Sequence, residues 1–87
     1  MSGFTVDFVC PVGFKHLAAE ISYQRQLICR IKSERADLRL EVDFFFDYRE
    51  PLEPLVLPLE EFIDLINELK AEVADLRARG AEEQGAE

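Results

Sequence analysis

The chain has 87 residues, with 10 Lys and Arg against 18 Asp and Glu, which gives a net charge of −8 at pH 7. A chain of this length forms one domain that buries about 60–65% of its surface, so a large cleft between two domains is excluded. The negative charge repels phosphate, which disfavours direct binding to nucleic acid and favours basic proteins or cations as partners. Hydrophobic residues make up 48% of the chain, which is too many for a disordered protein.

The ends and the cysteines indicate a cytoplasmic location. No apolar run approaches the roughly 18 residues of a membrane-spanning helix, so we expect no membrane association. Residues 1–10 contain Asp7 and no Lys or Arg, unlike the basic start of a secretory signal peptide. Two cysteines, Cys10 and Cys29, are too few for a disulfide scaffold.

The first part of the chain alternates between apolar and polar residues, as strands do. Residues 4–10 predict a strand that ends at the turn residues Pro11 and Gly13. Residues 17–23 and 26–31 predict a hairpin joined by Gln24 and Arg25, although the Ala and Leu of residues 14–23 would also suit a helix. Alternation places Ile28 and Arg30 on the outer side of this hairpin and Cys29 on the inner side.

The strongest pattern lies at residues 38–48, after a polar loop at 32–37. This run keeps a period of two over its whole length and predicts a long, central strand. Its inner side carries Leu38, Leu40, Val42, Phe44, Phe46 and Tyr48. Its outer side carries Arg39, Glu41, Asp43, Phe45 and Asp47.

The last third predicts one helix. Pro58 suits a first helical turn, apolar residues recur every three or four positions, and Gly80 is expected to end the helix. We therefore expect an α+β fold, in which one C-terminal helix packs on one face of an antiparallel meander of four to five strands. Residues 1–80 would form the single domain, and residues 81–87 a flexible acidic tail.

No motif indicates catalysis or a cofactor. The chain has no glycine-rich phosphate loop, no CxxC pair and no HExxH, and its single histidine, His16, has no nucleophile beside it in sequence. Glu41, Asp43 and Asp47 share one face of a strand and could approach a cation, but a solvated outer face explains them better. We expect a protein that is not an enzyme and that holds no metal.

The outer face of the sheet is the candidate binding surface, because the single helix covers only the other face. An apolar residue among charges is typical of a protein interface, and Phe45 between two aspartates fits that description. The proline-stiffened loop at 49–54 is a second candidate. The two surfaces give nine candidate partner-binding residues: Asp7, Glu20, Ile28, Glu41, Asp43, Phe45, Asp47, Glu50 and Glu53.

Three segments, "AAEISYQRQLICRI", "LRLEVDFFFD" and "PLEEFIDLINELKAEVADL", resemble the body of small acidic immunity proteins from bacterial polymorphic toxin systems. The shared layout is a hairpin of the form AEIxYxxQ…I, an acidic strand and a closing PLxEFIxxI helix. It covers about residues 17–76. The resemblance implies a protein that binds a cognate toxin domain and occludes its active site.

The composition agrees with that role, since an acidic surface complements the basic surface of a toxin that attacks nucleic acids or nucleotides. We expect a monomer that forms a 1:1 complex with a toxin acting in the cytoplasm. The alternative is a homodimer that buries its outer sheet face against a second copy. That contact would bring Asp43 and Asp47 near their own copies unless Arg30 or Arg39 intervened.

Overall fold

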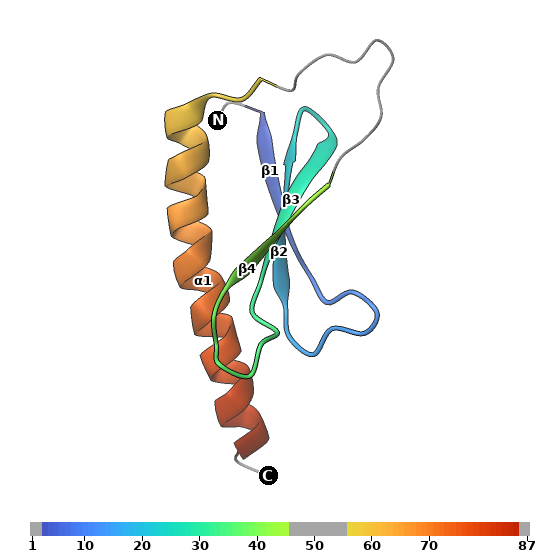
Figure 1. Ribbon diagram of the computed structural model, residues 1–87, viewed down its shortest axis with the longest axis vertical. Coiled ribbons are helices and arrows are strands. Elements are labelled where there is room, and N and C mark those ends of the chain that lie inside the picture. The colour runs from blue at the N-terminus through green and yellow to red at the C-terminus, as the bar shows by residue number, and fades with distance from the viewer. Residues whose placement is uncertain (1–2, 46–55, 86–87) are drawn as a thin grey trace.

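The computed structural model describes residues 3–45 and 56–85. In these residues, four antiparallel strands in the order β1-β2-β3-β4 form one sheet, and a single helix, α1, packs against one face of it (Figure 1). The α+β fold with a C-terminal helix is therefore confirmed. Each strand pairs with the strand that follows it in the chain, so the sheet is a meander.

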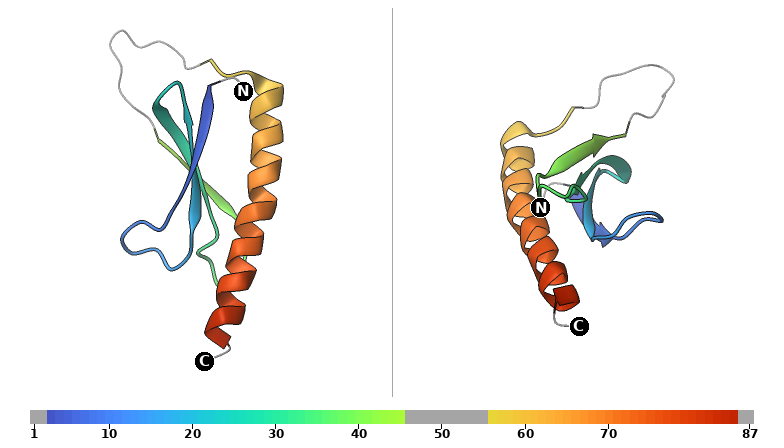
Figure 2. Two further views of the ribbon diagram at one scale, coloured as in Figure 1. Left: turned by 180° about the vertical axis from the view of Figure 1, so that it is seen from behind. Right: turned by 60° about the horizontal axis from the view of Figure 1, so that its bottom comes forward.

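The first two strands, β1 (Phe4–Val9) and β2 (Ala18–Tyr23), pair from Phe4↔Tyr23 to Val9↔Ala18. The turn between them begins as predicted, since the N–H of Phe14 donates to the carbonyl of Pro11 (2.9 Å) and Gly13 has a positive φ. The loop that follows projects away from α1 (Figure 2). Phe8, Cys10 and Leu17 are exposed, although each follows the alternation of the inner, apolar side of its strand.

Strand β3 (Gln26–Lys32) follows β2 after a two-residue turn, as predicted. Both turn residues, Gln24 and Arg25, have a positive φ, which matches the right-handed twist of a hairpin. The register then shifts, since Ile21 faces Cys29 while Ser22 faces Leu27. The residue left over on β3 is Ile28, which lies in a β-bulge.

The fourth strand, β4 (Glu41–Phe44), is shorter than predicted and lies at the edge of the sheet. The strand predicted over residues 38–48 was expected to be central and to begin at Leu38, and both expectations are wrong. A turn in which the N–H of Leu38 donates to the carbonyl of Arg35, together with a positive φ at Leu38, delays the strand until Glu41. Residues 46–48 lie outside the described residues.

Helix α1 (Leu59–Gly85) begins where Pro58 predicts, and its first turn carries Glu60 and Glu61. It continues past Gly80, so the predicted helix end is wrong, and part of the predicted tail is helical up to Gly85. The helix packs Leu69 and Val73 against β2 and β3. The core cluster comprises Ala19, Ile21, Ile28, Cys29, Ile31, Leu69 and Val73.

Candidate functional site

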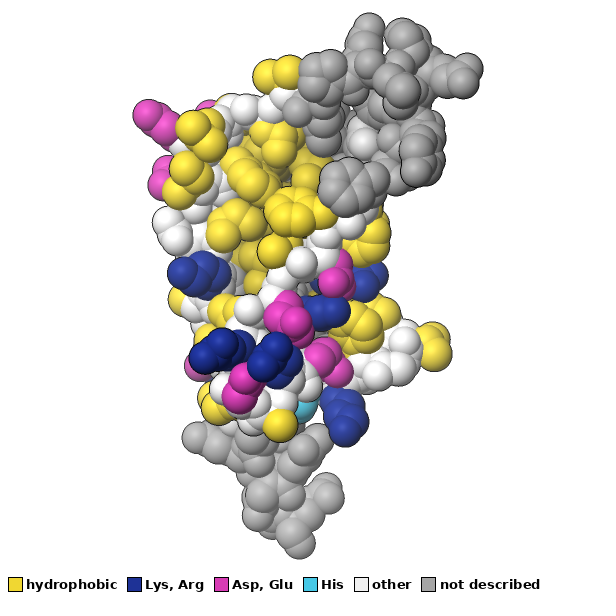
Figure 3. Space-filling view, in the orientation of Figure 1, with side chains coloured by type: hydrophobic (Ala, Val, Ile, Leu, Met, Phe, Trp, Pro, Cys, Tyr) yellow, Lys and Arg dark blue, Asp and Glu magenta, His cyan; other side chains and the backbone are white. Residues whose placement is uncertain are grey.

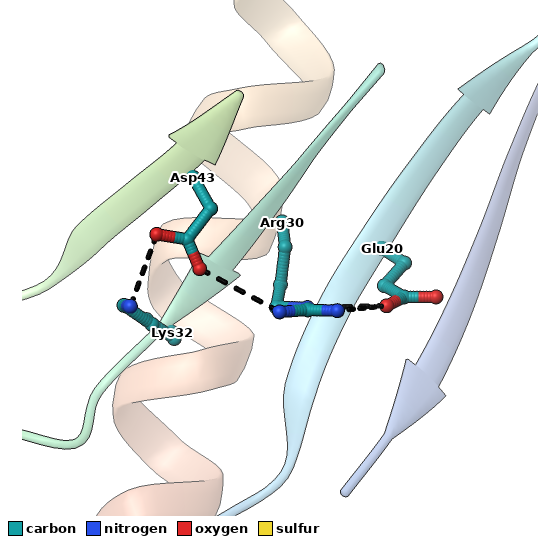
Figure 4. A network of polar contacts seen from close by, with 4 residues as sticks. All are labelled: Glu20, Arg30, Lys32 and Asp43. Atoms are coloured by element: carbon teal, nitrogen blue, oxygen red, sulfur yellow. Dashed lines mark hydrogen bonds and ion pairs between the residues drawn. The ribbon is translucent and has the colours of Figure 1, made fainter. Parts of the chain in front are cut away.

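The outer face of the sheet carries a chain of ion pairs across three strands, formed by Glu20, Arg30, Lys32 and Asp43 (Figure 4). We call these four residues the Arg30 network. The Arg30 guanidinium donates to Glu20 Oε2 from Nε (3.1 Å) and Nη2 (2.8 Å), and its Nη1 lies 3.6 Å from Asp43 Oδ2. Lys32 Nζ lies 3.0 Å from Asp43 Oδ1. The strand register brings these side chains together, because Glu20 faces Arg30 and Arg30 faces Asp43.

Two phenylalanines lie against the centre of this network. The Arg30 guanidinium is 5.1 Å from the ring centroid of Phe14 and 5.0 Å from that of Phe45, distances that favour cation–π attraction. Phe45 is therefore half-buried against a cation of its own chain. The network holds two acids and two bases, so its net charge is zero, and this part of the outer face is neutral.

The nine candidate residues do not form one surface. Glu20 and Asp43 belong to the Arg30 network, whereas Asp7 and Glu41 are exposed on the two edge strands. Ile28 was predicted to face outward, and this is wrong, because it is only 7% exposed and belongs to the core cluster. The β-bulge interrupts the alternation at that position.

Three further candidates, Asp47, Glu50 and Glu53, lie outside the described residues, together with the loop at 49–54.

A groove that the sequence did not predict runs between β4 and α1, with a volume of about 420 Å³. Figure 3 shows hydrophobic side chains gathered in one patch on the face that carries α1 and β4. We call this the β4–α1 groove. Its apolar lining comprises Ile31, Leu40, Val42, Phe44, Phe62, Ile63 and Ile66, and its polar lining Glu41, Asn67 and Lys70.

The groove is open because α1 does not cover β4. The buried helix residues Leu69 and Val73 pack in a cluster with residues of β2 and β3. Val42 is 45%, Phe44 53% and Ile63 47% exposed, although alternation and helical periodicity assigned all three to the core. Four strands about 4.8 Å apart span more than one helix of about 10 Å diameter can cover.

The first half of α1 carries a net charge of −4, which is half of the −8 of the whole chain. Between Leu59 and Leu69 the helix has four acidic residues and no Lys or Arg; the four are Glu60, Glu61, Asp64 and Glu68. All are exposed, and none forms an ion pair with another described residue. Glu61, Asp64 and Glu68 also line a second hollow with Phe4 and Val6 of β1. The helix, rather than the Arg30 network, therefore carries the acidic charge, mostly toward β1, whereas the charged lining of the β4–α1 groove is Glu41 and Lys70.

Two described groups, Cys29 and Asp37, have strongly shifted pKa values. Burial raises the pKa of the Cys29 thiol to about 11, which keeps it protonated and unreactive near neutral pH. The Arg35 guanidinium donates to both carboxylate oxygens of Asp37 (2.9 and 2.7 Å) and holds the Asp37 pKa at about 2. Within residues 3–45 and 56–85, no three His, Cys, Asp or Glu side chains lie close enough to bind a metal ion together.

A second carboxylate joins two loops. Glu34 accepts hydrogen bonds from the backbone N–H groups of Lys15 and His16, each at 2.8 Å. Those two hydrogen bonds lower the Glu34 pKa against the opposing effect of desolvation, which is the largest single contribution. The arrangement is structural, because it ties the loop after β1 to the loop after β3.

Comparisons with models of protein families, with curated proteins and with solved structures give no match. In the part of the chain that the structure describes, no helix combines the length and apolar character needed to cross a membrane.

Proposed function

We propose that this protein binds a basic toxin domain and neutralises it by occluding the toxin's active site, as the resemblance to immunity proteins implies. The observation that carries the proposal is the β4–α1 groove, where large apolar side chains are exposed beside an acidic helix. Apolar anchors within a polar rim are typical of protein interfaces, whereas the centre of the outer face has neutralised its own charges.

The charge distribution suits a basic partner. The acidic residues of the first half of α1 attract a positively charged surface over about a Debye length, which raises the association rate. The exposed apolar side chains would then supply most of the affinity once water leaves the groove. The acidic residues and the apolar anchors both lie on the side of the molecule that carries α1, so we expect the toxin to bind there.

A partner protein is favoured over self-association. The homodimer considered from the sequence would bury the outer sheet face, but there the Arg30 network already pairs its charges within one chain. Two copies would also bring together chains that each carry a net charge of −8. We therefore expect a monomer in the absence of the toxin, measured as mass by sedimentation equilibrium.

The test is co-expression with the product of the gene immediately upstream as the candidate toxin, followed by titration of the two purified proteins. We expect Phe44→Asp to weaken the complex by about 30-fold or more, the effect of losing a central apolar anchor. Phe8→Asp is the matched control, since Phe8 is 42% exposed on β1 at the opposite edge of the sheet and should leave binding unchanged. A toxin that stays active at saturating wild-type protein would overturn the proposed function.

A further inference from the structure

Strand β4 has a backbone edge that no described residue covers. Among residues 3–45 and 56–85 it pairs only with β3, and the N–H of Phe45 just beyond it donates to the carbonyl of Ile28 (2.9 Å). In an antiparallel ladder, the backbone N–H and C=O groups of one residue bond to the partner strand, and those of the next residue point away from it. Because Phe45 bonds to β3, Asp43 and Glu41 do so too, whereas the N–H and C=O groups of Val42 and Phe44 point to the open edge.

The same two residues line the groove with their side chains. Val42 and Phe44 therefore offer unpaired backbone groups along the edge and apolar side chains toward α1. A strand added at this edge would place every second side chain in the β4–α1 groove, near Phe44 and Ile63. A helix beside a free strand edge is a recurrent setting for recognition of an extended peptide.

The side chains on the outer face of β4 indicate which charge an added strand should carry. Glu41 and Asp43 direct their side chains to the outer side of β4, next to the positions that the alternate residues of an added strand would occupy. Glu41 is exposed and forms no ion pair with any described residue. Asp43 is partly exposed but already pairs with Arg30 and Lys32, so Glu41 is the stronger attraction for a basic side chain. Opposite charges on neighbouring strands stabilise their pairing, so basic residues fit these positions.

We propose that β4 binds an extended segment of the partner as a fifth strand, with apolar residues at alternate positions facing the groove and Lys or Arg between them. This inference rests on the proposed function for the identity of the partner, and it adds the part of the partner that is recognised. β4 is about 13 Å long at 3.3 Å per residue, so about four or five residues of the partner would pair with it.

A second copy of this chain fits the edge poorly. Antiparallel pairing of two β4 strands centred on Asp43 places that residue opposite itself, and pairing centred on Val42 places Asp43 opposite Glu41. Like charges directly opposite each other destabilise a strand pair. Pairing centred on Phe44 avoids these contacts but joins only residues 43–45 of the described chain, and it brings together two chains that each carry a net charge of −8. A basic segment of another protein avoids this repulsion.

The test uses blocked peptides of about nine residues with alternating Lys and Val, added to the full-length protein labelled with ¹⁵N. We expect amide exchange to slow at Val42 and Phe44 and to stay unchanged at Glu41 and Asp43, whose N–H groups are already bonded to β3. One control peptide has the same composition with its Lys residues before its Val residues. Another alternates Glu and Val, and a third is the Lys–Val peptide with methylated backbone nitrogens.

Equal binding by any of the three controls, or unchanged exchange at Val42 and Phe44, would overturn the added strand.

Two variants of one residue separate the backbone from the side chain. Val42→Pro removes an N–H that points away from β3 and replaces the side chain with a ring of similar size, which an edge strand tolerates, and it should weaken binding of the Lys–Val peptide about tenfold. Val42→Ala keeps that N–H and should weaken binding less. Thermal melts of both variants establish that the sheet is intact.

The same variants distinguish the two proposals. If the toxin binds wild type and Val42→Pro equally well, the edge strand is not its site, although neutralisation stands. If the Lys–Val peptide protects the edge but the toxin is not neutralised, the proposed function fails and the added strand is supported.

Discussion

The outer face of the sheet and the β4–α1 groove differ in what their side chains contact. On the outer face, Arg30 lies between two carboxylates and two phenylalanine rings, so its polar and aromatic groups are paired within the chain. In the groove, Val42, Phe44 and Ile63 are about half exposed and contact solvent. The charged outer face thus pairs its groups within the chain, whereas the β4–α1 groove leaves large apolar side chains exposed.

The largest expected effect comes from the core, where α1 covers β2 and β3. Ile21→Ala should lower the free energy of unfolding by about 2–5 kcal/mol, because Ile21 is fully buried and its removal leaves a cavity. Ile63→Ala, the matched change on the groove side, should cost less than about 1 kcal/mol. Urea denaturation measures both. Equal losses would mean that the groove is part of the core.

The buried thiol gives the next effect, at high pH. Folding raises the pKa of Cys29 from its ordinary value of 9.0 to about 11. Stability from this group is therefore complete below pH 9 and is lost as pH rises to 11, because the unfolded chain releases the proton first. The loss should reach about 2–3 kcal/mol.

The variant Cys29→Ala removes this group and isolates its contribution. The free energies of unfolding of wild type and variant, measured by urea denaturation, should converge by about 2–3 kcal/mol between pH 9 and 11. A constant difference across this range would show that the thiol is accessible in the folded state.

Replacing Arg30 tests whether the Arg30 network contributes to the free energy of unfolding. Arg30→Leu should cost about 1–3 kcal/mol, since it leaves Glu20 and Asp43 without their shared partner while keeping an apolar side chain between the rings. Both carboxylates are partly exposed, which holds the loss below that of a fully buried pair. Arg39→Leu is the control, because Arg39 is 80% exposed and its change should stay within about 0.5 kcal/mol. A similar cost for both would remove any special role of the network.

The smallest effect compares two adjacent phenylalanines on opposite faces. Phe45→Leu removes the ring that lies 5.0 Å from the Arg30 guanidinium and should cost about 0.5–1 kcal/mol. Phe44→Leu changes a ring that is mostly in solvent and should be close to neutral. Thermal denaturation of the pair checks the order, and a larger loss at Phe44 would contradict the exposure of the groove.

Local patterns were enough to predict much of the fold. Period-two alternation located β1, β2 and β3 to within a residue or two at each end, and Pro58 marked the start of α1. Alternation also assigned Glu20, Arg30 and Asp43 to one face correctly. Ile28 could not be placed this way, because a β-bulge depends on the register of two strands and leaves no mark in either one alone.

The groove was missed because periodicity shows which residues share a side and not how much of that side is covered. Val42, Phe44 and Ile63 follow the core pattern as regularly as Ile21 or Val73 do. A count of strands against helices could have found them, since four strands are wider than one helix. The pairing of Arg30 with Glu20 and Asp43 likewise required the strand register, which alternation does not supply.

The meander order has a consequence for synthesis. Each strand closes on the one before it through a short connection, so the sheet can form as the chain emerges and without distant contacts. Among the described residues, however, its apolar face is covered by α1, which follows the four strands in sequence. A sheet without the helix would expose Ile21 and Ile31 to water, and exposed apolar surface of this kind promotes aggregation. Docking of the helix, rather than pairing of the strands, therefore completes the core.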